Sequence, residues 1–254
     1  MSMKRYGLIG YPLHHSFSEN YFMNKFRNEK VDAVYNNFPI KTIAEFPDLI
    51  KKYPDLNGLN VTHPYKASII NYMDDIDNAA LKANAVNVIH ITRKGSKRTL
   101  KGFNTDTDGF VLSLKPLIDN SITKALVLGT GGASRAVQAG LERLGIDCSV
   151  VSRNKIKADL GYADLTGEFI TDYRLIINAT PLGMYPDTTS APDIPYESLG
   201  KGCILFDLVY NPPESLFLKR GKERACTIKN GMEMLHIQAE KTWEIWTSCF
   251  SGGT

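Results

Sequence analysis

The chain has 254 residues, of which 43% are hydrophobic and 22% charged, as in globular proteins rather than in disordered or fibrous chains. Its formal net charge of +3 is too small to indicate general binding to nucleic acid or to an anionic membrane. No apolar run approaches the roughly 20 residues needed to cross a bilayer, so we expect a cytoplasmic protein of one or two domains.

The first hundred residues alternate short apolar runs with amphipathic stretches. Runs bounded by Gly, Pro or Asn predict strands, and apolar residues at helical spacing predict helices. Strands are predicted at 6–10, 34–38, 59–62 and 85–91, and helices at 18–28, 43–52, 65–72 and 75–82. The basic cluster at 93–98 is interpreted as a solvent-exposed hairpin turn. The alternation of strand and helix indicates an α/β layer architecture.

A second α/β unit is predicted after about residue 104. Its strands are predicted at 124–128, 146–151, 175–178 and 204–207, with a helix at 134–144. The longest helical signal, at 232–250, carries one apolar stripe that we expect to pack on a core. The four cysteines form no C-x-x-C pair, so we expect reduced, buried thiols. No metal site is predicted.

The strand at 124–128 runs directly into the glycine-rich turn Gly129-Thr130-Gly131-Gly132-Ala133, and a predicted helix follows. Glycines at such a turn let a pyrophosphate approach the backbone, and the helix N-terminus offers free N–H groups to phosphate. This order of strand, turn and helix is the context that a dinucleotide-binding fingerprint requires. The spacing differs from G-x-G-x-x-G, and a tight turn without function would use glycines too.

The next strand ends in Ser152-Arg153-Asn154, and Lys157 lies four residues after Arg153. NAD-binding proteins usually carry an Asp or Glu at this position, which holds the ribose 2′-hydroxyl. Two cations in place of a carboxylate suit a 2′-phosphate, because Arg presents a planar fork to phosphate oxygens. The sequence therefore favours NADP over NAD, with a solvated surface Arg as the alternative interpretation.

Polar side chains gather near strand ends in the first half, where a core would need apolar ones. They are Ser16, Ser18, Asn60, Thr62, Lys66, Asn87 and Asp106. Together, hydroxyls, amides, one Lys and one Asp can form a cradle for a small polyhydroxylated acid. Each also has a structural explanation. Ser18 and Thr105 could cap helices, Asp106 could serve a helix dipole, and Asn60 could sit in a turn.

Seven short motifs run nearly from one end of the chain to the other. They lie at 15–18, 58–66, 85–87, 102–106, 178–184, 207–210 and 231–239. Each is modest evidence alone, but the set, in this order, resembles the shikimate dehydrogenase family. The resemblance implies reversible, NADPH-dependent reduction of 3-dehydroshikimate to shikimate, in the pathway to chorismate and aromatic amino acids.

The resemblance also assigns roles to residues of this chain. It implies that Lys66 is catalytic and paired with Asp106. A cation there can stabilise and protonate the alkoxide-like oxygen that hydride transfer leaves. Substrate contacts are implied for Ser16, Ser18, Asn60, Thr62, Lys66, Asn87, Asp106, Tyr210 and Gln238.

On the cofactor side, the resemblance implies a pyrophosphate site, a 2′-phosphate site and a ribose–nicotinamide site. The pyrophosphate site consists of Gly129, Gly131, Gly132 and Ala133. The 2′-phosphate site consists of Ser152, Arg153, Asn154 and Lys157. The ribose–nicotinamide site consists of Thr180, Leu208, Gly231 and Met234. The implied fold has two α/β domains. A shikimate-binding domain with a mixed sheet covers 1–103 plus 236–254, and a Rossmann-like NADP-binding domain covers 104–235. The C-terminal helix returns to the first domain, and we expect a monomer or homodimer.

Some positions depart from the usual pattern of the family. Asn84 stands where Gly is usual, Thr130 replaces a common Ala, and Ser152 replaces a common Asn. The stretch 155–171 is also short for the helix that normally follows the NADP-selecting turn. Among the predictions from the resemblance, the strength of the preference for NADP over NAD depends most on this short segment.

Three alternative functions stay open at this point. A quinate/shikimate dehydrogenase that also uses NAD is disfavoured by Arg153 and Lys157. A non-catalytic nucleotide-binding regulator would not need Lys66 or Asp106. A dehydrogenase of the methylenetetrahydrofolate type would not need Asn60, Thr62 or Gln238.

Overall fold

The computed structural model describes residues 3–13, 17–95 and 97–248, without the side chain of Lys157. The chain divides into two compact units. The first is Met1–Thr105 with Gln238–Thr254, and the second is Asp106–Ile237. Within the described ranges, no helix has both the length and the apolar character that crossing a membrane requires.

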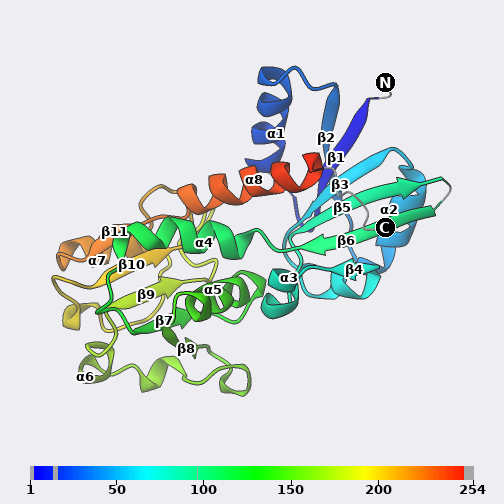
Figure 1. Ribbon diagram of the computed structural model, residues 1–254. Coiled ribbons are helices and arrows are strands. Elements are labelled where there is room, and N and C mark those ends of the chain that lie inside the picture. Colours follow the sequence, from blue (N-terminus) through cyan, green and yellow to red (C-terminus); the bar gives the residue numbers. More distant parts are fainter. Residues whose placement is uncertain (1–2, 14–16, 96, 249–254) are drawn as a thin grey trace. The chain divides into compact units, whose positions relative to one another are not determined.

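The first unit is built on a six-stranded mixed sheet in the order β2-β1-β3-β5-β6-β4 (Figure 1). Its strands are β1 (Lys4–Gly10), β2 (Ala33–Pro39), β3 (Leu56–Val61), β4 (Asp75–Ile76), β5 (Val88–Lys94) and β6 (Lys97–Phe103). Strand β1 pairs in parallel with β2 and β3, whereas β5 runs antiparallel to both β3 and β6. The helices are α1 (Phe17–Asn28), α2 (Phe46–Lys52) and α3 (Asn78–Ala83), with the 3-10 turns η1 (Ile43–Glu45) and η2 (Ser68–Tyr72).

The C-terminal helix α8 (Met232–Thr247) returns to the first unit and completes an aromatic core there. Trp246 stacks on Tyr6 with 4.6 Å between ring centroids, and its Nε1 donates to the carbonyl of Ile89 at 3.1 Å. Trp243 packs against Tyr6 and Phe26. The apolar stripe of this helix therefore packs on a core, as predicted, although residues 249 and 250 lie outside the described ranges.

The second unit has a five-stranded parallel sheet in the order β11-β10-β9-β7-β8 (Figure 1). Its strands are β7 (Lys124–Leu128), β8 (Asp147–Val151), β9 (Leu175–Asn178), β10 (Ile204–Asp207) and β11 (Thr227–Lys229). The longer helices are α4 (Asp106–Leu114), α5 (Gly132–Arg143) and α7 (Leu216–Glu223). Alternate residues of β7 enter different cores, Val127 with Phe110 and Leu126 with Phe217, so both faces of the sheet are covered.

The α/β prediction is confirmed, and the chain positions of most elements agree. The order of the second sheet reverses between β7 and β9, the switch point at which Rossmann-like sheets bind their ligands. The segment 155–171 holds only the 3-10 turns η4 (Lys155–Lys157) and η5 (Tyr162–Asp164) and the four-residue helix α6 (Gly167–Ile170). This agrees with the predicted lack of room for a longer helix.

Several predicted boundaries in the first unit were wrong. The predicted helix at 75–82 begins only at Asn78, because Asp77 caps it by accepting from the Ala80 N–H at 2.9 Å, and Asp75–Ile76 forms β4. The predicted helix at 65–72 is reduced to the 3-10 turn η2, and the strand predicted at 85–91 begins at Val88. The basic hairpin is confirmed, but its strands extend to Lys94 and Lys97.

In the second unit, the helix predicted at 134–144 begins two residues earlier, at Gly132. The described cysteines are free thiols: Cys203 and Cys226 are buried, and Cys148 is half-buried rather than buried as expected. Burial raises the pKa of the Cys203 thiol to about 12, which keeps it protonated. Cys249 lies outside the described ranges.

Candidate active site

The glycine turn joins β7 to α5 in a conformation that needs glycine at one position. Gly129 has φ 111°, a value that side-chain-bearing residues rarely adopt, and a Cβ there would lie 3.1 Å from the carbonyl oxygen of Ala179. A Cβ on Gly131 would meet open space instead. Helix α5 begins at Gly132, so its unpaired N–H groups face the turn. The turn therefore presents bare backbone and a helix N-terminus, which suit a pyrophosphate.

A pocket of about 410 Å³ lies beside this turn, lined by Thr130, Arg135, Gln138 and Val150. Arg135 and Gln138 are one turn apart on α5 and bring a cation and an amide to the same pocket. Sequence analysis singled out the glycines and missed both residues. The signal was present, because Arg135 is the third residue after Gly132 and so belongs to the first turn of the helix.

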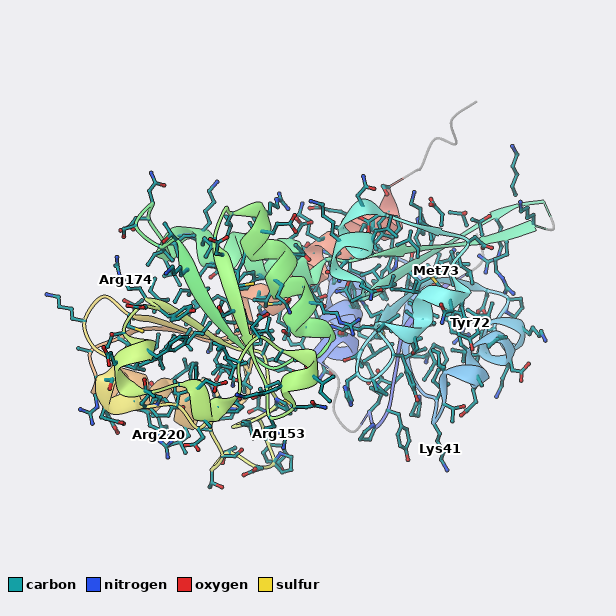
Figure 2. All side chains as sticks on the ribbon, turned by 90° about the horizontal axis from the view of Figure 1, so that it is seen from below. Lys41, Tyr72, Met73, Arg153, Arg174 and Arg220 are labelled. Carbon is teal, nitrogen blue, oxygen red and sulfur yellow. The ribbon has the colours of Figure 1, made fainter. Side chains whose placement is uncertain are left out.

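The turn after β8 holds the predicted 2′-phosphate residues. The Ser152 hydroxyl accepts from the Asn154 N–H at 3.2 Å, and the Asn154 side chain accepts from the Ile156 N–H at 3.0 Å. Arg153 is exposed (Figure 2) and makes no ion pair within the described part of the chain. Its neighbour Lys155 instead pairs with Asp164 at 2.7 Å. The turn is thus braced by Ser152 and Asn154, and the guanidinium of Arg153 faces solvent.

A buried network connects the carboxyl ends of β9 and β10. Asn178 donates from Nδ2 to Asp207 at 2.9 Å, and its Oδ1 accepts from the Thr180 hydroxyl at 2.6 Å. Asp207 also accepts from the Val209 N–H at 3.0 Å and from the Ser215 hydroxyl. Burial raises the pKa of Asp207 to about 6, although these hydrogen bonds act in the opposite direction. The network fixes the loops that carry Thr180 and Leu208.

The same loops approach the start of α8. A Cβ on Gly231 would lie 2.3 Å from the carbonyl oxygen of Leu208, so only glycine fits there. The Gly231 N–H donates to the carbonyl of Val209 at 3.2 Å, and Leu208 packs against the core that contains Met234. Within the second unit, the structure thus brings Leu208, Gly231 and Met234 together, and the network above links Thr180 to them. Tyr210 is half-buried, and burial raises its pKa.

In the first unit, two buried amides lie on neighbouring strand ends. Asn60, in β3, accepts at Oδ1 from the Tyr35 hydroxyl at 2.8 Å, and Tyr35 also hydrogen-bonds to Ser18. Asn87 accepts the Thr105 N–H at 2.8 Å and donates from Nδ2 to the Thr105 hydroxyl at 2.9 Å. The backbone joins them, because the Val61 N–H donates to the carbonyl of Asn87 at 2.8 Å. Asn60 is therefore a strand residue, and the turn interpretation was wrong.

Three more predicted residues adjoin these amides along the chain or through the backbone. Thr62 follows β3, and its N–H donates to the carbonyl of Ile9 at 2.9 Å. Lys66 is half-buried, and its carbonyl accepts from the Val86 N–H at 2.7 Å, next to Asn87. Gln238 is buried on α8. Ser18 lies inside α1 rather than at its cap, and Ser16 lies outside the described residues.

The predicted pairing of Lys66 with Asp106 joins residues of different units and stays a prediction. Asp106 is the first residue of α4 and of the second unit, and Lys66 belongs to the first. Among the described residues, no group of three or more His, Cys, Asp or Glu side chains could hold a metal ion. The described candidate residues therefore form two groups, an amide-rich group in the first unit and a group around the glycine turn in the second.

The chain is similar to known proteins. Residues 8–89 match the shikimate dehydrogenase substrate binding domain family. A shikimate dehydrogenase (NADP(+)) from Shouchella clausii is 37% identical over 96% of this chain and 93% of its own length. The chain belongs to the shikimate dehydrogenase family. A second member, the shikimate dehydrogenase (NADP(+)) from Methanococcus aeolicus, is 34% identical over 96% of this chain and 92% of its own length.

The fold of the family extends over the whole chain. The crystal structure of shikimate 5-dehydrogenase from Thermus thermophilus, in complex with NADP(H) and shikimate, is 29% identical with a TM-score of 0.84. The similarity covers 96% of this chain and 94% of that one. This similarity confirms the predicted two-domain α/β fold of a shikimate dehydrogenase.

Proposed function

We propose that this protein is an NADP-dependent shikimate dehydrogenase, which interconverts 3-dehydroshikimate and shikimate on the way to chorismate and aromatic amino acids. The observation that carries the proposal is the similarity to NADP(+) shikimate dehydrogenases at 34–37% identity over 96% of the chain. The amide-rich first unit and the nucleotide-binding turn of the second unit support it.

In the first unit, we assign the substrate to the polar group around Asn60 and Asn87. Ser16 and Ser18 would bind the carboxylate, and Thr62 and Gln238 would contact the ring together with the two amides. The family resemblance adds Tyr210, a residue of the second unit, to these contacts. The fixed hydrogen bonds of Asn60 and Asn87 support this assignment, because anchored amides are presented to hydroxyl groups in one orientation.

Lys66 and Asp106 would handle the proton. When bound, NADPH would supply a hydride to the ring carbonyl carbon, and the carbonyl oxygen would become alkoxide-like. The ammonium of Lys66 would stabilise this oxygen and donate a proton to it, and the carboxylate of Asp106 would hold the ammonium in place. In the oxidation of shikimate the same proton returns to Lys66.

In the second unit, the glycine turn with Gly129, Gly131, Gly132 and Ala133 would hold the pyrophosphate. Exposed Arg153, with Ser152, Asn154 and Lys157, would hold the 2′-phosphate, and Arg135 in the pocket beside the turn is a further candidate. Thr180, Leu208, Gly231 and Met234 would lie by the ribose and nicotinamide. The residues present fit NADP, because the turn offers a cation where NAD enzymes use a carboxylate.

The test is an assay of the purified protein with shikimate or quinate and with NADP or NAD, in which reduced cofactor is followed by absorbance. We expect turnover with shikimate and NADP, and loss of at least about 100-fold in kcat for Lys66→Ala with unchanged NADP binding. Lys51→Ala is the control, because Lys51 forms only a surface ion pair with Asp48 at 3.6 Å. Binding of NADP or NAD without oxidation of either shikimate or quinate would favour a non-catalytic nucleotide-binding regulator. Fast oxidation of quinate with NAD would favour the quinate enzyme.

Cellular and assembly properties are part of the proposal. We propose a cytoplasmic enzyme with small-molecule ligands only, present as a monomer or homodimer. Light scattering during size-exclusion chromatography decides between the two states. Co-purification with nucleic acid would contradict this part of the proposal.

A further inference from the structure

A buried threonine on α8 connects the two substrate amides of the first unit. Thr242 is fully buried, and its hydroxyl donates to the carbonyl of Gln238 at 2.8 Å. The same oxygen lies 3.4 Å from Asn60 Nδ2 and 3.4 Å from the Thr105 hydroxyl. All of these residues belong to the first unit. None of the family motifs assigns a role to Thr242.

The donors and acceptors of this network can be arranged in only one way. A hydroxyl has one donor and two acceptor sites, so Thr242, which donates to Gln238, must accept from both Asn60 and Thr105. The Thr105 hydroxyl donates to Thr242 and therefore accepts from Asn87 Nδ2 at 2.9 Å. The hydrogen-bonding capacity of the Thr242 hydroxyl is then filled.

The arrangement also fixes which way each amide points. Tyr35 donates to Asn60 Oδ1 while Thr242 accepts from Asn60 Nδ2, so turning this amide over would break both bonds. Asn87 is also fixed by two bonds to Thr105. The Thr105 hydroxyl accepts from Asn87 Nδ2, and the Thr105 N–H donates to Asn87 Oδ1. The Thr242 hydroxyl therefore holds the Asn60 amide directly, and it connects to Asn87 through the Thr105 hydroxyl, while the Thr105 N–H fixes which way Asn87 points.

We propose that Thr242 is a positioning residue for the substrate, which holds Asn60 in its orientation, supports Asn87 through the Thr105 hydroxyl, and ties both amides to the helix that carries Gln238. This inference rests on the proposed function, since it assigns the two amides to a polyhydroxylated acid. Thr242 itself need not touch the substrate. Its effect is on affinity for shikimate rather than on NADP.

The helix provides a matched control for a purely structural role. Thr247 lies on α8 and its hydroxyl donates to the carbonyl of Trp243 at 2.7 Å, the same bond along the helix that Thr242 makes to Gln238. Thr247 is exposed, and its other described bond is also to a helix carbonyl, that of Glu244. Thr247→Val thus removes the helix bond alone, whereas Thr242→Val also removes the acceptor for Asn60 and Thr105.

The variants Thr242→Val, Thr242→Ser and Thr247→Val are compared by steady-state kinetics and by calorimetric titration with shikimate. We expect Thr242→Val to raise the KM and Kd for shikimate about tenfold, the effect of one buried polar group left unpaired. Its KM for NADP and its kcat should change less than about twofold. Thr242→Ser retains the hydroxyl and should restore the KM, and Thr247→Val should match the wild type. An unchanged KM for shikimate in folded Thr242→Val, or an equal rise in Thr247→Val, would overturn the proposal.

A second measurement does not depend on turnover. The side-chain NH₂ signals of Asn60 and Asn87 in ¹H–¹⁵N NMR spectra should shift in Thr242→Val, return in Thr242→Ser and stay in place in Thr247→Val. If the wild type neither binds nor oxidises shikimate, the proposed function fails, and these signals alone decide whether Thr242 orients the amides. Unchanged NH₂ signals of Asn60 and Asn87 in Thr242→Val would contradict the proposed role of Thr242. If Thr242→Val does not fold, Thr242→Ala removes the same hydroxyl and should raise the KM for shikimate in the same way.

Discussion

At the residue scale, Asn84 shows how one departure from the family pattern is accommodated. It closes α3 in the left-handed conformation, with φ 44° and ψ 44°, and its N–H donates to the carbonyls of Ala80 and Leu81. Gly and Asn are the residues that adopt this conformation most readily. The substitution of the usual Gly by Asn therefore keeps the turn that leads to Asn87.

This conformation makes a prediction about residue 84. We expect Asn84→Gly to change the free energy of unfolding by less than about 0.5 kcal/mol, and Asn84→Ala to lower it by about 1 kcal/mol, because Gly has no Cβ and Ala lacks the polar side chain that makes this conformation accessible to Asn. Urea unfolding of both variants and the wild type measures the difference. Equal stabilities of the Ala and Gly variants would contradict it.

Asp207 predicts a pH dependence of stability. Its pKa is about 6 in the folded protein and 3.8 ordinarily, so the folded state binds its proton more tightly than the unfolded state. The favourable contribution is complete below about pH 4 and is lost as the pH rises to about 6, by up to about 3 kcal/mol. Asp207→Asn keeps the shape and cannot titrate.

The measurement is urea unfolding of the wild type and of Asp207→Asn between pH 4 and pH 7. We expect the wild type to lose stability relative to the variant as the pH rises through this interval. Parallel curves for the two proteins would show that Asp207 has the same pKa folded and unfolded.

The sequence predicts site residues better than it predicts their surroundings. The glycine turn and Arg153 are readable because their spacing follows from phosphate chemistry. The position of Arg135 in the first turn of α5 was also readable, but only the structure shows that its side chain lines a pocket. Thr242 and Tyr35 were missed because their bonds to Asn60 join positions far apart in the chain. Such contacts exist only after folding.

At the scale of elements, the packing of α8 on β3 depends on a missing side chain. A Cβ on Gly58 would lie 2.2 Å from Trp246 Nε1, the atom that donates to the carbonyl of Ile89. Glycine in a strand is unfavourable by itself. At this position it allows the indole to lie flat against the strand.

We predict that Gly58→Ala displaces Trp246 and lowers the free energy of unfolding by about 2 kcal/mol, because a methyl group is forced into a packed core. The tryptophan emission should shift to longer wavelength in the folded state. Gly200→Ala is the control, since a Cβ there meets no atom within 4 Å and should leave both quantities unchanged. An unshifted spectrum and full stability for Gly58→Ala would contradict the prediction.

Sequence patterns located the strands that carry an apolar run of their own and failed at β4, which carries none. Strands β9 and β10 were predicted with the same bounds that the structure shows. Each has four consecutive buried residues, and the first three of them are apolar. Strand β4 was missed because its two residues form a strand only by pairing with Lys101 and Gly102 of β6. Nothing local to Asp75–Ile76 distinguishes it from the start of a helix.

At the scale of the whole molecule, the first unit is discontinuous in sequence and the second is continuous. Both tryptophans of the chain, Trp243 and Trp246, lie in the segment that returns to the first unit. They contact Tyr6, Phe22, Phe26 and Tyr35, which come from β1, α1 and β2. The first 105 residues therefore lack part of their core until this helix is present.

A chain that ends at Ile237 tests this division. We expect it to bind NADP with nearly normal affinity and to lose shikimate oxidation, because the second unit is complete and Gln238 with the aromatic core is missing. It should also bind the dye ANS, owing to the uncovered aromatic surface. Absence of ANS binding, or retained turnover of shikimate, would contradict the division into units.

The discontinuity also sets the order in which the protein can mature on the ribosome. Domains usually fold in the order of their synthesis. Here β1 to β6 are made before the segment from Gln238 onward on which they depend, while Asp106–Ile237 is complete before α8 has emerged in full. The second unit can therefore fold during translation, whereas the unit that carries Lys66 reaches its final form only after α8 has been made. Chaperones that protect nascent aromatic surfaces would act on the aromatic residues of β1, α1 and β2 during this interval.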